Sequence, residues 1–349
     1  MSDKEGKVLL EAEGLVMHFP VSARSLSPFA ERKTVKAVQD VSFKVYEGET
    51  LGLVGESGCG KSTTGKMIVK LLQPTAGAIR FEGADINALK GNEELAFRRQ
   101  VQIIFQDPFS SLDPRYKVGQ TIGEPLIVHK TGDKKSRRER VIEIMQDVGL
   151  KSEMYGRYPH EFSGGQRQRI GVARALALNP RLIVCDEPVS SLDVSIQAQI
   201  LNLMKELQRK YKLTYVFISH NLLVVKHLCD RIAVMYLGHI VELARRDDLF
   251  ARRLHPYTQA LFDAIPIADP DVKTMNELLQ GDIPSPIDPP PGCVFNTRCP
   301  YARQRCLEQT PALQPDTDSH LVACHFYRDL RPSALRAEQS AEEAGKAAV

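Results

Sequence analysis

Apolar and polar positions alternate along residues 8–19 and 35–45, which is the period of half-buried β-strands. Short, nearly continuous apolar runs follow, at Thr50–Val54, Val101–Phe105, Leu182–Cys185, Tyr215–Ser219 and Ile232–Tyr236. Between them the spacing is often helical, as at Ser62–Leu72. Strands that alternate with helices predict an α/β fold around a mostly parallel core sheet.

The same pattern divides the chain into three parts. The strand–helix alternation fills residues 1–254, and residues 107–180 show so little strand pattern that we expect a helical insertion there. Five prolines fall between residues 284 and 291, which excludes a central strand or a helix interior. We therefore expect a small, loop-rich C-terminal unit over residues 255–330. The Ala/Glu-rich residues 331–349 are predicted to be a disordered tail.

Composition narrows the class of protein. The 349 residues carry a net charge of +3, contain no Trp and are only 7% aromatic. These values argue against a dedicated nucleic-acid binder and against a stacking surface for single strands. No apolar run reaches the ~18–20 residues that span a bilayer, and the charged start is not a signal peptide. We expect a soluble, cytoplasmic chain, in which seven Cys do not imply disulfides.

A phosphate-binding loop is predicted between the third expected strand and the helix that follows it. The segment matches G-x-x-x-x-G-K-[ST] and has the flanking elements that this motif requires. Its glycines let successive backbone N–H groups face phosphate oxygens, and the helix N-terminus adds positive charge. Lys61 is expected to reach the β- and γ-phosphates and Ser62 to bind Mg²⁺. The expected nucleotide contacts here are Gly55, Glu56, Ser57, Gly58, Cys59, Gly60, Lys61, Ser62 and Thr63.

Acidic residues and a histidine follow two other predicted strands. Asp186 and Glu187 come directly after Leu182–Cys185, at the carboxyl end of a strand, where α/β sheets bind ligands. We expect Asp186 to hold Mg²⁺ and Glu187 to deprotonate the attacking water. His220 follows Tyr215–Ser219 at the same sheet edge and is predicted to steer that water. The alternatives are an exposed acidic turn and a structural histidine.

A second anion-binding segment stands before the predicted helix 167–178. It closely resembles the signature sequence of ATP-binding cassette (ABC) ATPases, with Phe162 where Leu is usual; its residues are Ser163, Gly164, Gly165 and Gln166. Gln106 resembles the Q-loop glutamine, and Ser191, Leu192 and Asp193 resemble the D-loop. The resemblance implies a P-loop NTPase fold with an antiparallel β subdomain and a helical subdomain. It also implies ATP hydrolysis and two head-to-tail cassettes that sandwich ATP between one phosphate loop and the partner's signature.

The resemblance assigns further roles. It makes Gln106 a Mg²⁺ ligand beside Ser62 and Asp186, and it points to Phe19 as the residue that stacks on adenine. Gly58-Cys59, Gln106-Asp107-Pro108, residues 110–115, Tyr158-Pro159-His160 and His255–Thr258 are similar to the peptide/nickel-importer subfamily, and most of all to dipeptide-permease ATPases of the DppF type. This likeness implies peptide uptake and a peripheral place on the cytoplasmic face of the inner membrane. The implied partners are a second ATPase subunit, two transmembrane permease subunits and, indirectly, a substrate-binding protein.

Four of the seven cysteines form a cluster near the C-terminus: Cys293, Cys299, Cys306 and Cys324. Four thiolates suit Zn²⁺ or an iron–sulfur cluster, and the spacing C-x₅-C-x₆-C-x₁₇-C lacks the short pairs common in zinc sites. Arg298 and Arg303 lie nearby and would support an anionic cluster. The family's C-terminal segment carries a [4Fe–4S] centre at matching positions. Zinc and four unliganded thiols stay open as alternatives.

Two other functions are alternatives to the importer ATPase. One is a soluble ABC ATPase that acts on nucleic acid or ribosomes, but such proteins generally carry two cassettes, long coiled coils or inserted zinc modules. The other is an iron–sulfur electron carrier with a vestigial cassette, which the complete set of ATP-site residues argues against. We therefore predict an importer ATPase without a nucleic-acid partner.

Overall fold

The computed structural model describes residues 6–21, 33–107, 111–264 and 281–330. The predicted tail at 331–349 and most of the polar excursion between the first two strands lie outside these residues. No helix in the described part of the chain is long and apolar enough to cross a membrane.

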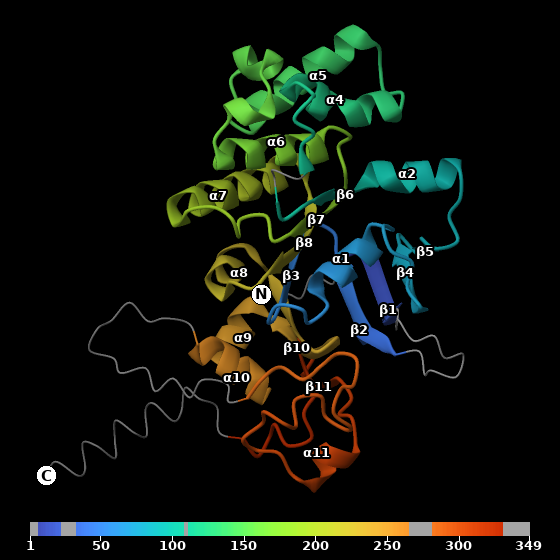
Figure 1. Cartoon of the computed structure of the whole chain (residues 1–349), viewed down its shortest axis with the longest axis vertical. Helices are drawn as coiled ribbons and strands as arrows, with labels where there is room; N and C mark the ends of the chain where they lie inside the picture. The colour runs from blue at the N-terminus through green and yellow to red at the C-terminus, as the bar shows by residue number, and fades with distance from the viewer. Residues whose placement is uncertain (1–5, 22–32, 108–110, 265–280, 331–349) are drawn as a thin grey trace, which may run out of the picture.

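An eight-stranded sheet forms the centre of the molecule (Figure 1). Its order is β11-β12-β10-β9-β3-β8-β7-β6, and the five strands from β9 to β6 are parallel. The predicted apolar runs all lie in this parallel part. The strands are β3 (Thr50–Val54), β6 (Val101–Ile104), β7 (Leu182–Asp186), β8 (Thr214–Ser219), β9 (Arg231–Tyr236), β10 (His239–Arg245), β11 (Gln314–Thr317) and β12 (His320–Val322).

A second sheet, of four antiparallel strands in the order β2-β1-β4-β5, contains the two alternating stretches from the start of the chain. Its strands are β1 (Val8–Pro20), β2 (Thr34–Tyr46), β4 (Ala76–Phe81) and β5 (Ala84–Asp85). The alternation predicted β1 and β2 within one residue at each end. The expected antiparallel β subdomain is therefore present.

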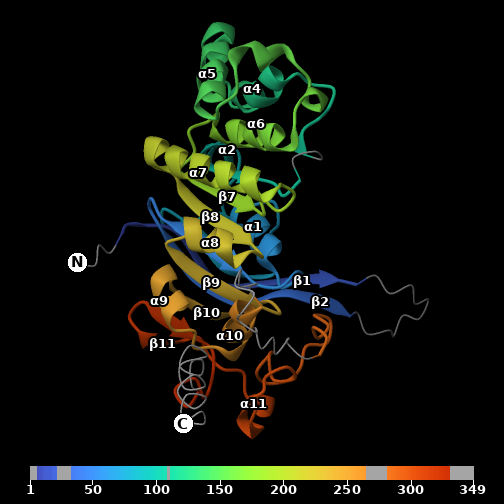
Figure 2. The same cartoon turned by 90° about the vertical axis from the view of Figure 1, so that its left-hand side faces the viewer.

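Helices cover the central sheet and form the predicted helical insertion. In both views α4, α5 and α6 gather at the end of the molecule opposite the C-terminal segment (Figures 1 and 2). Among the described residues, the α-helices are α1 (Lys61–Ile68), α2 (Asn92–Gln100), α4 (Val118–Val128), α5 (Lys134–Asp147), α6 (Gly164–Leu176), α7 (Val194–Tyr211), α8 (Leu222–Leu228), α9 (Arg246–Ala251), α10 (Pro256–Asp263) and α11 (Gln304–Glu308), and the 3₁₀ turns are η1 (Ser152–Gly156) and η2 (Pro159–Glu161).

The central strands bury both of their faces. Along β7, Val184 packs with α1 and the antiparallel sheet, whereas its neighbour Cys185 packs with α7 and α8 on the other side. Val216 and Phe217 of β8 alternate in the same way. Burial of each such side chain stabilises the fold by about 1.5–3 kcal/mol. Because both faces are covered, these strands appear in the sequence as continuous apolar runs.

The C-terminal segment differs from the separate unit that the proline-rich sequence suggested. Strand β12 pairs antiparallel with β10, with Glu242 opposite Val322, so the segment extends the central sheet. Cys293, Phe295 and Cys306 are buried in the same apolar core as the helices α7 and α8. Residues 281–330 therefore fold onto the first part of the chain and share its core.

Candidate functional site

The predicted phosphate loop lies between β3 and α1, at the carboxyl end of a central strand. Gly60 has φ +103°, and a Cβ there would lie 2.3 Å from the carbonyl oxygen of Ala37. A Cβ on Gly55 would meet the Met235 carbonyl oxygen at 2.1 Å. Only glycine fits either position, so the loop keeps the tight curl that turns its N–H groups inward.

Lys61 is folded back over this loop. Its Nζ donates to the carbonyl oxygens of Gly55 and Glu56, at 2.9 and 2.8 Å, and the residue is only 4% exposed. Ser57, Gly58 and Cys59 belong to the same turn, and Thr63 to the first turn of α1. Their contacts with a nucleotide stay predictions.

Ser62 and Asp186 meet at the edge of the sheet. The Ser62 hydroxyl donates to the Asp186 carboxylate at 2.7 Å, although 124 residues separate them in sequence. Burial raises the pKa of Asp186, and the hydrogen bond from Ser62 and the charges of Lys66 and Lys61 only partly oppose this. A buried carboxylate beside a hydroxyl is a donor set that fits Mg²⁺, whose charge would offset the cost of burial.

Glu187 is the centre of a second group at the same edge. Its Oε2 accepts a hydrogen bond from Gln106 Nε2 at 2.9 Å and lies 3.1 Å from His220 Nδ1. Its backbone has φ +47°, a left-handed conformation that costs a non-glycine residue about 1–3 kcal/mol. Gln106 and His220, which follow two other strands, thus converge on the Glu187 carboxylate. Gln106 is directed to Glu187 here, and its role as a Mg²⁺ ligand stays a prediction.

The signature segment begins α6 in the helical part of the molecule. Ser163 caps this helix by accepting from the backbone N–H of Gln166, whose side chain accepts in return from the Ser163 N–H. A Cβ on Gly165 would lie 2.6 Å from Ile196 of α7, and one on Gly164 would lie 3.5 Å from Leu192 of the predicted D-loop. The small residues therefore let the signature pack against the start of α7, directly after Ser191, Leu192 and Asp193.

The signature and the phosphate loop lie apart within this chain. In both views α6 lies with α4 and α5 in the helical region, whereas α1, which follows the phosphate loop, lies beside the central strands (Figures 1 and 2). The predicted adenine contact, Phe19, is paired with Val35 near the end of β1. Val35 is two residues from Ala37, which touches the phosphate loop. The stacking role of Phe19 stays a prediction.

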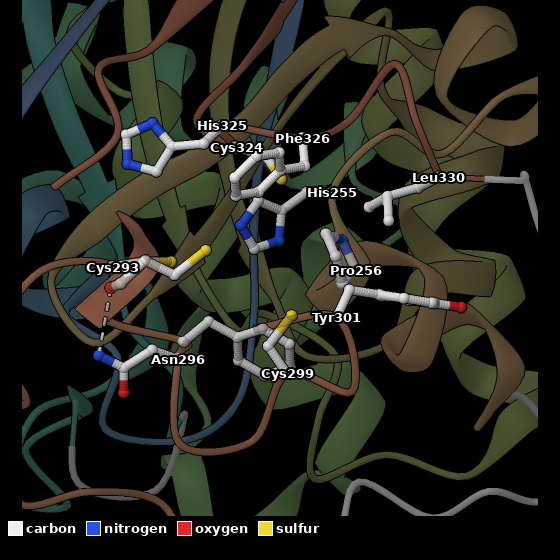
Figure 3. A pocket seen from close by; sticks show the side chains of 12 residues that line it. His255, Pro256, Cys293, Asn296, Cys299, Tyr301, Cys324, His325, Phe326 and Leu330 are labelled. Carbon is white, nitrogen blue, oxygen red and sulfur yellow. Dashed lines mark hydrogen bonds between the residues drawn. The ribbon is translucent and has the colours of Figure 1, made fainter. Parts of the chain in front are cut away.

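The four clustered cysteines line one cavity, together with His255 and Phe295 (Figure 3). None of the four forms a disulfide. Burial raises the pKa of Cys293 to about 11 and that of Cys299 to about 12, so both stay protonated at neutral pH without a cation. The Cys293 N–H donates to the Cys306 carbonyl oxygen at 2.8 Å, which joins two sides of the cavity. Among the described residues, no group of three or more His, Cys, Asp or Glu forms a ready site for a single metal ion.

The two arginines near the cluster both pair with carboxylates, and their support of an anionic cluster stays a prediction. Arg298 forms a bidentate ion pair with Glu56 of the phosphate loop, and Arg303 pairs with Asp329. Tyr257, which was predicted only as part of the family-like segment His255–Thr258, accepts the Glu56 N–H with its hydroxyl at 2.9 Å. The two contacts with Glu56 join residues about 200 to 240 positions apart, and no local pattern signals them.

Comparison with known proteins agrees with this geometry. Residues 38–190 match the family model described as ABC transporter, and residues 241–306 match the oligopeptide/dipeptide transporter C-terminal region. The chain is 51% identical over 324 residues to the putative oligopeptide transport ATP-binding protein YkfD of Bacillus subtilis, which covers 92% of this chain and 96% of the relative. It is also 51% identical over 322 residues to the oligopeptide transport ATP-binding protein OppF of Escherichia coli, with 91% and 96% covered.

A solved structure shares the fold. The ATP-binding cassette MJ0796, determined as a dimer in a post-hydrolysis state bound to ADP and phosphate, superposes with a TM-score of 0.60 at 27% identity. The match covers 68% of this chain and 99% of that one. The chain therefore belongs to the ATP-hydrolysing ATP-binding subunits of the ABC transporter family, in the oligopeptide transport branch.

Proposed function

We propose that this chain is the ATP-hydrolysing motor of an ABC importer that takes up dipeptides or other short peptides. The observation that carries the proposal is the pair of groups at one sheet edge. Ser62 and Asp186 form one group, and Glu187 with Gln106 and His220 forms the other. This is the arrangement that phosphoryl transfer to water requires, because it places a metal-binding pair beside an oriented base.

Each residue has a distinct part in the proposed reaction. Glu187 accepts the proton of the attacking water, while Gln106 and His220 hold its carboxylate in position. Lys61 leaves the carbonyl oxygens of its own loop and neutralises phosphate charge. Ser62 and Asp186 would hold Mg²⁺ when nucleotide is bound, and the ion would supply further charge neutralisation. Hydrolysis by these residues requires a water molecule that is positioned at Glu187. Closure of a second cassette over the site would position that water.

The need for a second cassette follows from the place of the signature. The N–H groups at the start of α6 form an anion-binding helix N-terminus, yet they lie away from the chain's own phosphate loop (Figure 1). A head-to-tail partner would bring its signature to this loop and receive this chain's signature at its own. We propose a related but different ATPase subunit as that partner, so that the pair is a heterodimer.

The remaining partners follow from the proposed transport. We infer that two transmembrane permease subunits bind this chain on the cytoplasmic face of the inner membrane, and that a substrate-binding protein delivers the peptide to them. The relatives are named as oligopeptide transport proteins, which supports peptide cargo. A DppF-type preference for dipeptides is the narrower form of the proposal.

We also propose that the cysteine-lined cavity binds a [4Fe–4S] cluster that stabilises the C-terminal segment. Cys293, Cys299, Cys306 and Cys324 supply the thiol ligands that such a cluster takes, and they surround a common cavity (Figure 3). The backbone contact between Cys293 and Cys306 and the hydrogen bonds of Asn296 to Pro291 and Cys306 hold this loop in shape. Since burial disfavours the free thiolates, positively charged iron would offset that cost.

Purification of the complex through a tag on this chain tests the proposal. We expect two permease subunits and a second ATPase to copurify, and dipeptides to compete best with a labelled peptide for uptake. Iron determined on the same anaerobic sample should equal about four per chain. Copurification of ribosomal or nucleic-acid components instead would contradict the importer function, and an iron-free sample would contradict the cluster alone.

A further inference from the structure

Glu56, the second residue of the phosphate loop, is held from outside the loop by the C-terminal segment. Both Nη atoms of Arg298 reach the Glu56 carboxylate, at 2.8 and 3.2 Å. The side chains of Arg298 and Glu56 are 5% and 22% exposed, so this pair is more shielded from water than the exposed ion pairs of the surface. Tyr257 adds a hydrogen bond to the Glu56 backbone. Side chain and backbone of one loop residue are thus fixed by two separate segments.

The same residue is contacted from inside the loop. Lys61 donates to the carbonyl oxygens of Gly55 and Glu56. When Lys61 turns toward nucleotide phosphates, those carbonyl oxygens lose their donor. The contacts from Arg298 and Tyr257 do not depend on Lys61. They can therefore hold Glu56 in place while Lys61 moves from the loop carbonyl oxygens to the nucleotide phosphates.

An aromatic cluster connects this attachment to the cysteine-lined cavity. The ring of Phe295 lines the cavity and packs 5.2 Å from Tyr236 and 5.5 Å from Tyr257, measured between centroids. All three rings are 1% exposed or less. The N–H of Arg298 donates to the Phe295 carbonyl oxygen in the turn between Cys293 and Cys299. The turn that joins Cys293 and Cys299 therefore also contains Arg298, which pairs with Glu56 of the phosphate loop.

We propose that Arg298 is a positioning residue for the phosphate loop. By holding Glu56, Arg298 sets the affinity of the loop for ATP. That affinity therefore depends on the cysteine-lined segment to which Arg298 belongs. The inference rests on the proposed ATP site and needs neither the peptide cargo nor the iron–sulfur cluster. It gives the C-terminal segment a direct role at the nucleotide site.

Nucleotide binding to the purified full-length chain tests the proposal. We expect Arg298→Gln to raise the Kd for ATP by about tenfold, as small displacements of positioning groups do. In the ATPase assay with the partner subunit present, KM should rise while kcat changes less than twofold. Arg298→Lys should recover part of the affinity, because an ammonium pairs with only one carboxylate oxygen.

A double-mutant cycle separates the specific pair from general damage to the fold. Glu56→Gln should weaken ATP binding about as much as Arg298→Gln, and the double variant should be no worse than either single variant. The matched control is Arg252→Gln, which breaks another arginine–carboxylate pair between the C-terminal hairpin and the rest of the chain, with Asp316 at 2.8 Å. It should leave the Kd unchanged.

Three results would overturn the inference. The first is that Arg298→Gln and Glu56→Gln both bind ATP within twofold of the wild type. The others are strictly additive losses of ATP affinity in the double variant, or a loss of ATP affinity in Arg252→Gln as large as that in Arg298→Gln. If Arg298→Gln fails to fold, the Glu56→Gln variant still decides, because it alters the pair from the loop side. Lys61→Ala serves as the reference for the site itself. A normal Kd in that variant would refute the proposed ATP site rather than the role of Arg298.

Discussion

Replacement of Glu187 by Gln isolates the proposed proton transfer from the geometry that supports it. The carboxylate is 14% exposed and is contacted by Gln106 and His220. A glutamine amide has the same shape, so its oxygen can take the place of Oε2, accept from Gln106 Nε2 and lie beside His220 Nδ1. It cannot accept a proton from water. A positioned base contributes about 10²- to 10⁴-fold to rate, which corresponds to about 2.7–5.4 kcal/mol in the barrier.

ATP hydrolysis by the complex and ATP binding to the chain measure the two effects separately. We expect Glu187→Gln to lower kcat by at least about a hundredfold and to leave the Kd for ATP within twofold. Glu206→Gln, at an exposed position on α7, is the control for loss of a carboxylate and should retain full activity. If Glu187→Gln hydrolyses ATP at more than a tenth of the wild-type rate, Glu187 is not the base. Equal loss of ATP binding would show that the substitution damaged the site.

Further variants test the other parts of the account. Lys61→Ala should raise the Kd for ATP at least about tenfold, since it removes the phosphate-neutralising charge; normal titration by a fluorescent ATP analogue would contradict this. Gly60→Ala should abolish ATP binding in a folded protein, because its Cβ would lie 2.3 Å from the Ala37 carbonyl oxygen; calorimetric binding close to that of the wild type would contradict it. Cys306→Ser should lower the iron content and the broad visible absorption of anaerobic protein, and iron equal to the wild type would exclude this ligand. Burial lowers the pKa of His239 from its ordinary value of 6.5, so the unfolded chain takes up this proton first as the pH falls. The free energy of unfolding should therefore decrease below pH 6.5, by at most about 1.4 kcal/mol per pH unit. Urea titrations of His239→Gln should show a shallower dependence, and an unchanged slope would refute the assignment.

The sequence predicted the parallel part of the fold because its signals are local. Thr50–Val54 is apolar and is followed by glycines and then by helical spacing, so strand, loop and helix could each be placed. The convergence of Asp186, Glu187 and His220 followed from one rule, that the carboxyl ends of parallel strands share an edge. The signature segment was recognised for the same reason, since its serine and glycines are adjacent in sequence.

Contacts between distant segments could not be predicted in this way. Strand β10 (His239–Arg245) contains the fully buried Glu242, which breaks the apolar pattern and is paired with His320 of β12. No continuous apolar run marks β10, and the proline-rich stretch after it suggested a separate unit. In the structure, β12 pairs with β10 and extends the central sheet. Arg298 and Glu56 are 242 residues apart. Their pairing depends on how the C-terminal segment packs, whereas the place of Arg298 in the sequence indicated only its nearness to the cysteines.

Uptake of a labelled dipeptide into vesicles that contain the purified complex tests the central claim most directly. ATP is supplied on the side that carries this chain, and wild-type complex is compared with complex that carries Glu187→Gln. We expect uptake that requires ATP in the wild type and that falls to the ATP-free background in the variant, although the variant still binds ATP. Uptake at the wild-type rate with Glu187→Gln, or wild-type uptake that does not depend on ATP, would contradict the claim.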